Sequence, residues 1–452
     1  MIRNSFDRLV TSLVVGFGVG ACGEMRDDAA ESDQALLAVE AALETDGSAA
    51  TAALVKAKLP PAKLLFPYPS SVASTLDAGT PPALGRNDGT GRALNLFIDS
   101  SSTAESPDGS RAAPFPRIQQ AIDRIEQTGT VSVARGTYAE NLVISRKSVA
   151  IIGPQDGGAV LAATAEATPA IRIDEAIGAS IERLVIERPW GSGIVVRNSA
   201  NVRLHQNKIT EAIEAGVVVF ESARVIIANN AIQSTRASRY LGRGWGTGVI
   251  AARSVHLELV GNSLTENALV GIAIDTCVDV TLSGNAIKKT RPSYSSYGWG
   301  VLVVGSRRFV ITRNDVSENI GVGIAAFFGG AGRIAENQVA GTAMQNDEGQ
   351  ARDGYGIAAW DGARADIVGN VVGRSGKAGT LISAASAVIA NNVISESGRY
   401  ALVTQNYQGQ NRLRVVSNDF GGQRWADSPY YETVSTPDST SILRPPDPQT
   451  IP

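Results

Sequence analysis

Cysteine, histidine and aromatic residues are scarce in this sequence of 452 residues. It has two Cys and two His, and aromatic residues make up 6% of the chain. Two Cys exclude a disulfide-rich scaffold. The formal net charge of −3 gives no general footprint for nucleic-acid binding, so we expect no nucleic-acid partner. The sequence also lacks a Walker loop, a zinc-ligand spacing and a dinucleotide fingerprint, so no motif predicts a metal or a cofactor.

The apolar run from Leu9 to Ala21 is too short to span a membrane as a mature helix, and it is typical of a signal peptide. It ends in Val19-Gly20-Ala21-Cys22, which resembles a bacterial lipobox. The resemblance implies cleavage before Cys22, lipidation of its thiol and a membrane partner reached through the lipid. Gly23 after the Cys favours retention at the outer membrane. We therefore expect a bacterial cell-envelope lipoprotein, with ordinary secretion as the alternative.

A repeat of fixed spacing runs from Gly193 to Asn370. Seven times a Gly is followed fourteen positions later by an Asn. The steps from each Asn to the next Gly are 9, 18, 9, 15, 9 and 19 residues, so the basic unit has 23 residues and every second unit has a longer connection. The pairs are Gly193/Asn207, Gly216/Asn230, Gly248/Asn262, Gly271/Asn285, Gly300/Asn314, Gly323/Asn337 and Gly356/Asn370.

Each unit contains three short apolar runs and no room for a helix. The unit that starts at Gly216 shows them as Val217-Val218-Val219, Val225-Ile226-Ile227 and Ile232. Three short strands in 23 residues fit one coil of a parallel β-helix, stacked about 4.8 Å from its neighbours. The Asn column is expected to hydrogen-bond along the stack, and the Gly column suits a bend where the chain re-enters a strand.

These units resemble the coils of right-handed parallel β-helix proteins, the pectate-lyase-like superfamily. The segments Leu94–Asp99, Asp108–Ser110, Ile118–Ile122 and Gly136–Glu140 resemble the usual start of such a helix, and the similarity covers about 94–420. The resemblance implies an all-β fold, a single-stranded solenoid of about 23 residues per coil. The superfamily contains lyases, hydrolases, epimerases and non-enzymatic surface proteins, so the fold does not give the function.

Four segments are predicted along the chain. Residues 1–22 are the signal peptide, 23–93 an Ala- and Pro-rich flexible tether, 94–424 the β-helix and 425–452 an irregular C-terminal tail. Pro116 to Glu126 reads as a short helix with Ile118, Ala121, Ile122 and Ile125 on one face. We expect this helix to cap the open N-terminal end of the solenoid.

The long connections after Asn230, Asn285 and Asn337 should project from one edge, about 10 Å apart. Aromatic faces stack on sugar rings and Arg forks bind carboxylates, so the aromatic and Arg residues near these connections are predicted to bind a polysaccharide. The alternative is that the aromatics pack the loops onto outward strand positions that are themselves apolar. The predicted ligand-binding residues are Arg239, Tyr240, Arg243, Trp245, Tyr294, Tyr297, Trp299, Tyr355 and Trp360. The apolar outward positions are Val218, Phe220, Ile250, Leu302, Val304, Phe327 and Trp360.

Catalysis would need charged residues gathered at the strand ends. Lyases of the resembled superfamily typically use a basic residue with Ca²⁺ held by carboxylates, and hydrolases use two or three Asp on adjacent coils. The candidates here are Glu221, Arg253 and Asp275. The alternative is a surface ion-pair ladder. His205 and His256 receive no catalytic role, because a lone His is usually structural.

The sequence therefore predicts a cell-envelope surface protein that binds, or also processes, an extended polysaccharide along the β-helix. One alternative is a polysaccharide lyase or a related carbohydrate-active enzyme, the only case in which Ca²⁺ would be a cofactor. Another is a structural or adhesive scaffold that binds a protein. The sequence indicates no oligomeric state.

Overall fold

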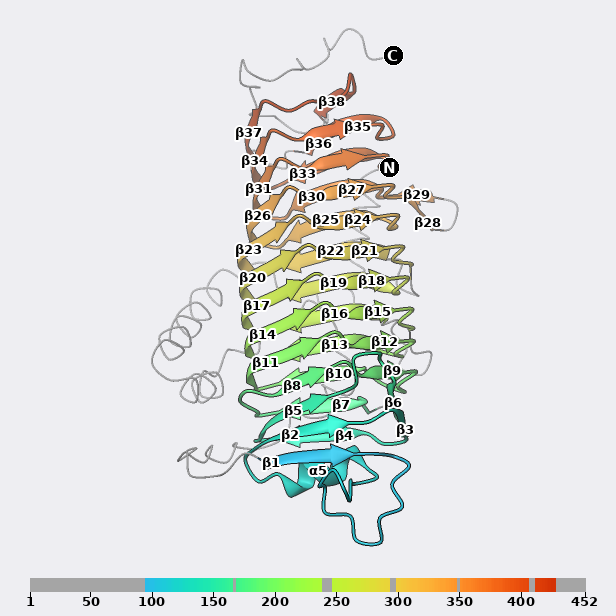
Figure 1. Cartoon of the computed structure of the whole chain (residues 1–452). Coiled ribbons are helices and arrows are strands. Elements are labelled where there is room, and N and C mark those ends of the chain that lie inside the picture. The colour runs from blue at the N-terminus through green and yellow to red at the C-terminus, as the bar shows by residue number, and fades with distance from the viewer. Residues whose placement is uncertain are drawn as a thin grey trace, which may run out of the picture.

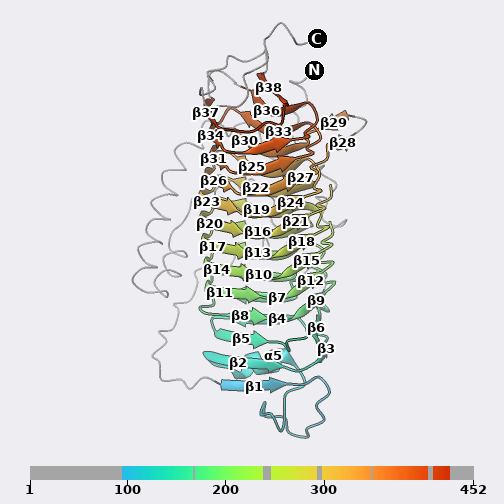
Figure 2. The same ribbon diagram turned by 45° about the horizontal axis from the view of Figure 1, so that its top comes forward.

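The chain winds into a parallel β-helix whose strands stack in three sheets (Figure 1). The computed structural model describes residues 94–165, 168–237, 246–292, 298–347, 350–405 and 411–427. Each coil contributes one strand to each sheet in turn, so the sheets run side by side along the axis (Figure 2). We call them sheet A with 13 strands, sheet B with 11 and sheet C with 12.

Sheet A comprises β1 (Leu94–Ile98), β2 (Thr128–Val133), β5 (Ser148–Ile152), β8 (Ser180–Glu182), β11 (Ala200–His205), β14 (Ala223–Ala228), β17 (Val255–Val260), β20 (Val278–Ser283), β23 (Arg307–Thr312), β26 (Ala331–Ala335), β31 (Arg364–Val368), β34 (Ser386–Ala390) and β37 (Arg412–Val416). Sheet B comprises β3 (Gly136–Tyr138), β6 (Ala159–Ala162), β9 (Val185–Glu187), β12 (Lys208–Thr210), β15 (Ala231–Gln233), β18 (Ser263–Thr265), β21 (Ala286–Lys288), β24 (Asp315–Ser317), β27 (Gln338–Ala340), β32 (Val371–Gly373) and β35 (Val393–Ser395). Sheet C comprises β4 (Leu142–Ser145), β7 (Ile171–Asp174), β10 (Ile194–Arg197), β13 (Ala215–Phe220), β16 (Thr247–Ala252), β19 (Leu269–Asp275), β22 (Gly298–Val304), β25 (Val322–Phe327), β30 (Tyr355–Trp360), β33 (Ala378–Ser383), β36 (Tyr400–Gln405) and β38 (Arg424–Asp427). The short strands β28 (Gln345–Asp347) and β29 (Gln350–Arg352) form an antiparallel hairpin between β27 and β30.

The strand register follows the repeat seen in the sequence. Val217 in β13 pairs with Val249 in β16, which pairs with Ile272 in β19. These side chains are buried in the axial core, because the β-branched residue after each Gly faces inward. The first strand begins at Leu94, and the last strand, β38, extends past residue 424, where the predicted β-helix ends. The segments predicted as signal peptide and tether lie outside the described residues.

The Asn column forms a continuous hydrogen-bond ladder. The side chain of Asn262 donates from Nδ2 to Oδ1 of Asn285 at 2.9 Å and to the carbonyl oxygen of Ile227 at 2.7 Å, and the same contacts repeat along the stack. Every ladder Asn is almost fully buried, so each amide replaces the water that the turn would otherwise need. The ladder consists of Asn207, Asn230, Asn262, Asn285, Asn314, Asn337, Asn370, Asn392 and Asn418.

The Gly column has a different cause from the expected bend. Gly271 lies inside β19, and a Cβ there would come within 2.6 Å of the carbonyl oxygen of Gly300 and 2.4 Å of Cγ2 of Ile287. A Cβ at Gly216, Gly248 or Gly300 would likewise meet the carbonyl oxygen of the next Gly in the column and a side chain of sheet B in the same coil. Glycine is therefore required by close packing between coils and against sheet B.

The predicted cap is present as the helix α5 (Ile118–Arg124), which lies beside β1 at one end of the solenoid (Figure 1). Ile118, Ala121 and Ile122 face the core. The carboxylate of Glu140 accepts hydrogen bonds from the backbone N–H of Ile118 at 2.7 Å and of Gln119 at 3.0 Å, which caps the helix from another element. Across the described ranges, no helix has the length and apolar character needed to cross a membrane.

Candidate functional site

Three of the predicted ligand-binding aromatics lie in the described residues, and all three are buried. Trp299 is 2% exposed, Tyr355 5% and Trp360 3%. The predicted residues Arg239, Tyr240, Arg243, Trp245, Tyr294 and Tyr297 lie outside the described residues.

The buried aromatics belong to a second apolar cluster on the outward face of sheet C. Trp360 packs edge-to-face against Trp299 at 5.8 Å and against Phe327 at 4.7 Å between ring centroids. Lys377 Nζ lies 5.0 Å from the centroid of the Tyr355 ring, and burial raises the pKa of Tyr355. This arrangement matches the packing alternative for these side chains. The apolar outward positions named from the sequence are members of the same cluster: Val218, Phe220, Ile250, Leu302, Val304, Phe327 and Trp360.

Glu221 and Arg253 directly follow the neighbouring strands β13 and β16 of sheet C, so they lie close together. Nη2 of Arg253 lies 3.1 Å from Oε1 of Glu221, and both residues are in left-handed turns, with φ of 48° and 46°. Burial raises the pKa of Glu221, although the guanidinium groups of Arg253 and Arg197 oppose that shift. Asp275 follows on the next coil, where it accepts a hydrogen bond from the hydroxyl of Thr276 at 2.8 Å.

The same row of charges continues towards the N-terminal coils. Asp174 pairs with Nε of Arg172 at 2.9 Å and with Nε of Arg197 at 3.2 Å. Acidic and basic side chains alternate in sign from coil to coil through Asp174, Arg197, Glu221, Arg253 and Asp275, although Glu221 and Arg253 lie one residue beyond the strand position that the other three share. This alternation fits the ion-pair ladder alternative. The three candidate catalytic residues, Glu221, Arg253 and Asp275, lie on neighbouring coils, and Arg253 forms an ion pair with Glu221.

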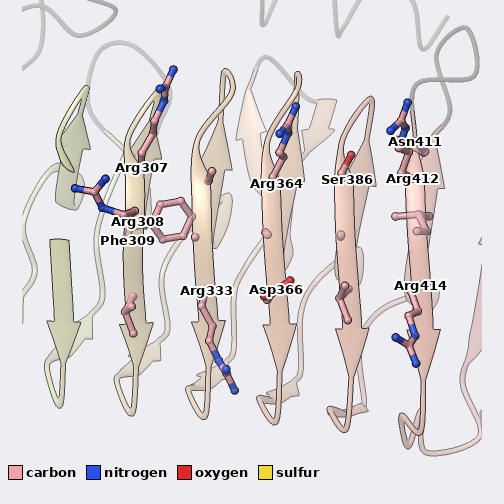
Figure 3. A pocket seen from close by; sticks show the side chains of 17 residues that line it. Arg307, Arg308, Phe309, Arg333, Arg364, Asp366, Ser386, Asn411, Arg412 and Arg414 are labelled. Carbon is pink, nitrogen blue, oxygen red and sulfur yellow. The ribbon is translucent and has the colours of Figure 1, made fainter. Parts of the chain in front are cut away.

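An arginine groove lies on the outward face of sheet A in the last coils (Figure 3). It encloses about 1020 Å³ and crosses β23, β26, β31, β34 and β37. Its lining includes six Arg and one acidic residue, Asp366, in a protein whose net charge is −3. The arginines are Arg307, Arg308, Arg333, Arg364, Arg412 and Arg414.

Most of these arginines carry uncompensated charge. Arg308 is paired, because Asp279 accepts hydrogen bonds from its Nε at 2.5 Å and its Nη2 at 2.7 Å. Four others are exposed and have no carboxylate partner among the described residues: Arg333, Arg364, Arg412 and Arg414. The groove is therefore a concentrated positive surface that suits carboxylate, sulfate or phosphate groups.

Our sequence analysis missed this groove, although the sequence holds a signal for it. Arg364 and Arg412 each stand six residues before a ladder Asn, and Arg333 and Arg414 stand four residues before one. Positions six and four before the Asn are both on the outward face of sheet A. Counting back from the Asn column would therefore have aligned these arginines on one surface.

No group of three or more His, Cys, Asp or Glu side chains is placed to hold a metal ion within the ranges that the structure describes. His256 contacts Asp279 through Nδ1 at 3.3 Å, and Nε2 of His205 lies 3.2 Å from Nδ2 of Asn229.

Comparison with known proteins identifies the fold. Residues 169–342 match the family described as right handed beta helix region. No curated protein matches the sequence. Together with the three parallel sheets, the family match confirms the predicted right-handed parallel β-helix.

Several solved structures resemble the chain. The periplasmic alginate epimerase AlgG has a TM-score of 0.48 and 13% identity, over 66% of this chain and 74% of that protein. The Dettilon tailspike protein has a TM-score of 0.46 and 13% identity, over 74% and 62%. The GH136 lacto-N-biosidase from Eubacterium ramulus has a TM-score of 0.43 and 11% identity, over 72% and 67%. With identities and TM-scores this low, these likenesses say nothing about the ligand or activity of this chain.

Proposed function

We propose that this protein binds an extended acidic polysaccharide in the arginine groove of sheet A. The observation that carries the proposal is the presence of four exposed arginines without a carboxylate partner on the surface of five consecutive coils. Arg forks bind carboxylates bidentately, and a row of them favours a polyanion over a single small anion. The surface is long and open along the axis, which suits a polymer.

The binding surface proposed here lies on the face of sheet A, whereas the surface predicted from the sequence lies at the loop edge of sheet C. Trp299, Tyr355 and Trp360 pack in the sheet C cluster, so their burial favours a structural role. The groove instead supplies charge from Arg and an apolar floor from residues such as Val310 and Val388. A few polar groups over an apolar floor are typical of ligand sites.

The test measures binding of the full chain to acidic and neutral polysaccharides by calorimetry. We expect binding to polyuronates and none to a neutral glucan of similar length. The double variant Arg364→Ala/Arg412→Ala should weaken polyuronate binding by at least about a hundredfold, because each lost charge-assisted contact is worth about 1.5–3 kcal/mol.

Arg203→Ala is the matched control. Arg203 is exposed on β11 and lies outside the groove. The strand register places it at the same position as Val310, four coils away, through Ile226, Glu258 and Thr281. Its loss should leave the affinity unchanged. Equal effects of Arg203→Ala and of the double variant would show general attraction of charge and would reject the groove as the site.

We also propose that Cys22 is lipidated and tethers the protein to the bacterial cell envelope. The support is the apolar run that ends in Val19-Gly20-Ala21-Cys22. Cys22→Ser should release the protein from the membrane fraction. Cys277→Ser is the control, because Cys277 is fully buried and occupies a column shared with Ser254 and Ser306. Retention of the Cys22→Ser variant in membranes would contradict the anchor.

A further inference from the structure

The arginines of the groove form two rows that run along the axis of the solenoid. The strand register aligns the first row as Arg307, Ala331, Arg364, Ser386 and Arg412. It aligns the second row, in the middle of the strands, as Val310, Arg333, Asp366, Val388 and Arg414. Figure 3 shows Arg307, Arg364 and Arg412 pointing to one side of the groove and Arg333 and Arg414 to the other.

The first row repeats its positive charge on every second coil. Coils are about 4.8 Å apart, so Arg307, Arg364 and Arg412 are spaced by about 10 Å along the axis. The coils between them carry the small residues Ala331 and Ser386 at the same position. A ligand lying along this row therefore meets a cation, then a small residue, then a cation.

In the first three coils of the groove, the cation of the second row is offset by one coil from the cations of the first row, whereas Arg414 shares a coil with Arg412. Arg333 lies on the coil between those of Arg307 and Arg364, so the cations zigzag across the groove. On the coil of Arg364 the second row carries Asp366. An anion placed at that point would face a like charge, which costs free energy. The last strand carries Arg412 and Arg414 and accepts an anion on either side.

A flat chain of 1,4-linked uronic acid rings with equatorial linkages has this charge pattern. Successive rings are turned over, so their carboxylates alternate between the two edges of the ribbon. Carboxylates on one edge then recur every two rings, a length comparable to two coils. The edge that faces Asp366 presents hydroxyl groups, and these can donate hydrogen bonds to a carboxylate. Chains with axial 1,4-linkages are buckled rather than flat, so their rings do not form a ribbon with carboxylates along two straight edges.

We infer that the groove selects a flat, β-1,4-linked polyuronide whose carboxylates alternate between its edges. This inference rests on the proposed function, since it concerns the same groove. Carboxylates of three successive rings bind Arg307, Arg333 and Arg364, and a carboxylate of a later ring binds Arg412. Asp366 repels any chain that places an anion on the second row at the coil of Arg364. Asp366 is thus a specificity-determining residue.

The test compares oligomers of β-1,4-glucuronate, made by oxidation of cellulose, with α-1,4-galacturonate oligomers of equal length. Both carry one carboxylate per ring, so they differ in geometry and not in charge. We expect the full chain to bind the glucuronate at least about tenfold more tightly. Asp366→Asn should narrow that ratio by raising the affinity for galacturonate, with little change for glucuronate.

Glu258→Gln is the matched control for Asp366→Asn. Glu258 is exposed and belongs to the continuation of the second row, beyond the groove. It should leave both affinities unchanged. Equal affinities for the two oligomers, or a change on Asp366→Asn that is the same for both, would overturn the inference while leaving the proposed function in place. Binding to neither oligomer would overturn both.

Discussion

At the level of single residues, the carboxyl group of Asp361 is stabilised in its protonated form by burial. Asp361 follows Trp360 in a left-handed turn with φ of 52°, and burial raises the pKa of its carboxyl to about 6 from an ordinary 3.8. No cation contributes to that shift. Asp361 therefore holds a proton more tightly in the folded chain than in the unfolded chain.

We predict that Asp361→Asn stabilises the protein at neutral pH. Because the folded pKa is the higher one, the stability linked to Asp361 is fully present below about pH 4 and is lost as the pH rises through about 6. The variant should gain at most about 3 kcal/mol at pH 8 and nothing at pH 4. Asn tolerates the left-handed turn.

Thermal unfolding followed by circular dichroism at both pH values measures this effect. Asp366→Asn serves as the control, because its carboxylate is exposed. A gain for Asp361→Asn that is equal at pH 4 and pH 8 would contradict the argument from burial.

The Asn ladder gives a second prediction at this scale. Oδ1 of Asn285 accepts hydrogen bonds from the backbone N–H and from the side-chain Nδ2 of Asn262, both at 2.9 Å. Nδ2 of Asn285 donates to the carbonyl oxygen of Leu259 at 2.8 Å. Asn285→Ala should lower the free energy of unfolding by about 2–4 kcal/mol, because buried donors lose their acceptor. Urea unfolding measures it. Asn229→Gly, at an exposed neighbouring turn, should cost far less, and an equal cost would refute the ladder account.

At the scale of elements, the ends of the solenoid depend on contacts that the repeat cannot supply. The helix α5 covers the core with Ile118, Ala121 and Ile122, and its first N–H groups depend on Glu140 rather than on its own N-cap residue. A buried carboxylate is thus part of the cap.

Glu140→Ala should loosen α5 and lower the free energy of unfolding by about 1–3 kcal/mol, since two N–H groups lose their acceptor. The exposed core should also bind more of a hydrophobic dye such as ANS. Glu140→Gln keeps one acceptor oxygen and should have an intermediate effect. Dye binding that stays at the wild-type level in Glu140→Ala would show that the cap does not need this carboxylate.

At the level of the whole molecule, the outward faces of sheet A and sheet C carry different kinds of side chain. Sheet C carries buried apolar side chains on its outward face, whereas sheet A presents exposed arginines in its last coils. Among the described residues, arginines without a carboxylate partner are thus concentrated in the last coils of sheet A, although the net charge of the chain is small. Polyanion binding to such a face is governed by long-range electrostatics.

We predict that polyuronate affinity falls steeply with salt. The Debye length shortens from about 30 Å at 0.01 M to about 3 Å at 1 M salt, so the affinity should fall by about tenfold or more over that range. Titrations at several salt concentrations measure the slope. The double variant Arg364→Ala/Arg412→Ala should show a shallower slope. A slope equal to that of the unaltered protein would mean that these arginines carry none of the electrostatic attraction.

The solenoid could be predicted from the sequence. The Gly and Asn spacing predicted the coil length, the three strands per coil and the ladder, because a stacked repeat must place equivalent residues above one another. The apolar face of α5 likewise predicted the cap. The Gly column shows the limit of this reasoning: its position was read correctly, but its cause is the close approach of the next coil, which depends on packing between distant residues.

Which surfaces are open to solvent could not be predicted from the sequence and follows from the packing of the coils. Trp299 and Trp360 have the chemistry of a sugar platform, but they are buried and Trp360 packs against Phe327. Burial is set by neighbours that sequence spacing does not reveal. Arg333 and Arg364 lie 31 positions apart in the chain and belong to adjacent strands. Register brings them into one groove, because a parallel sheet aligns residues by hydrogen bonding between coils and not by their distance along the chain.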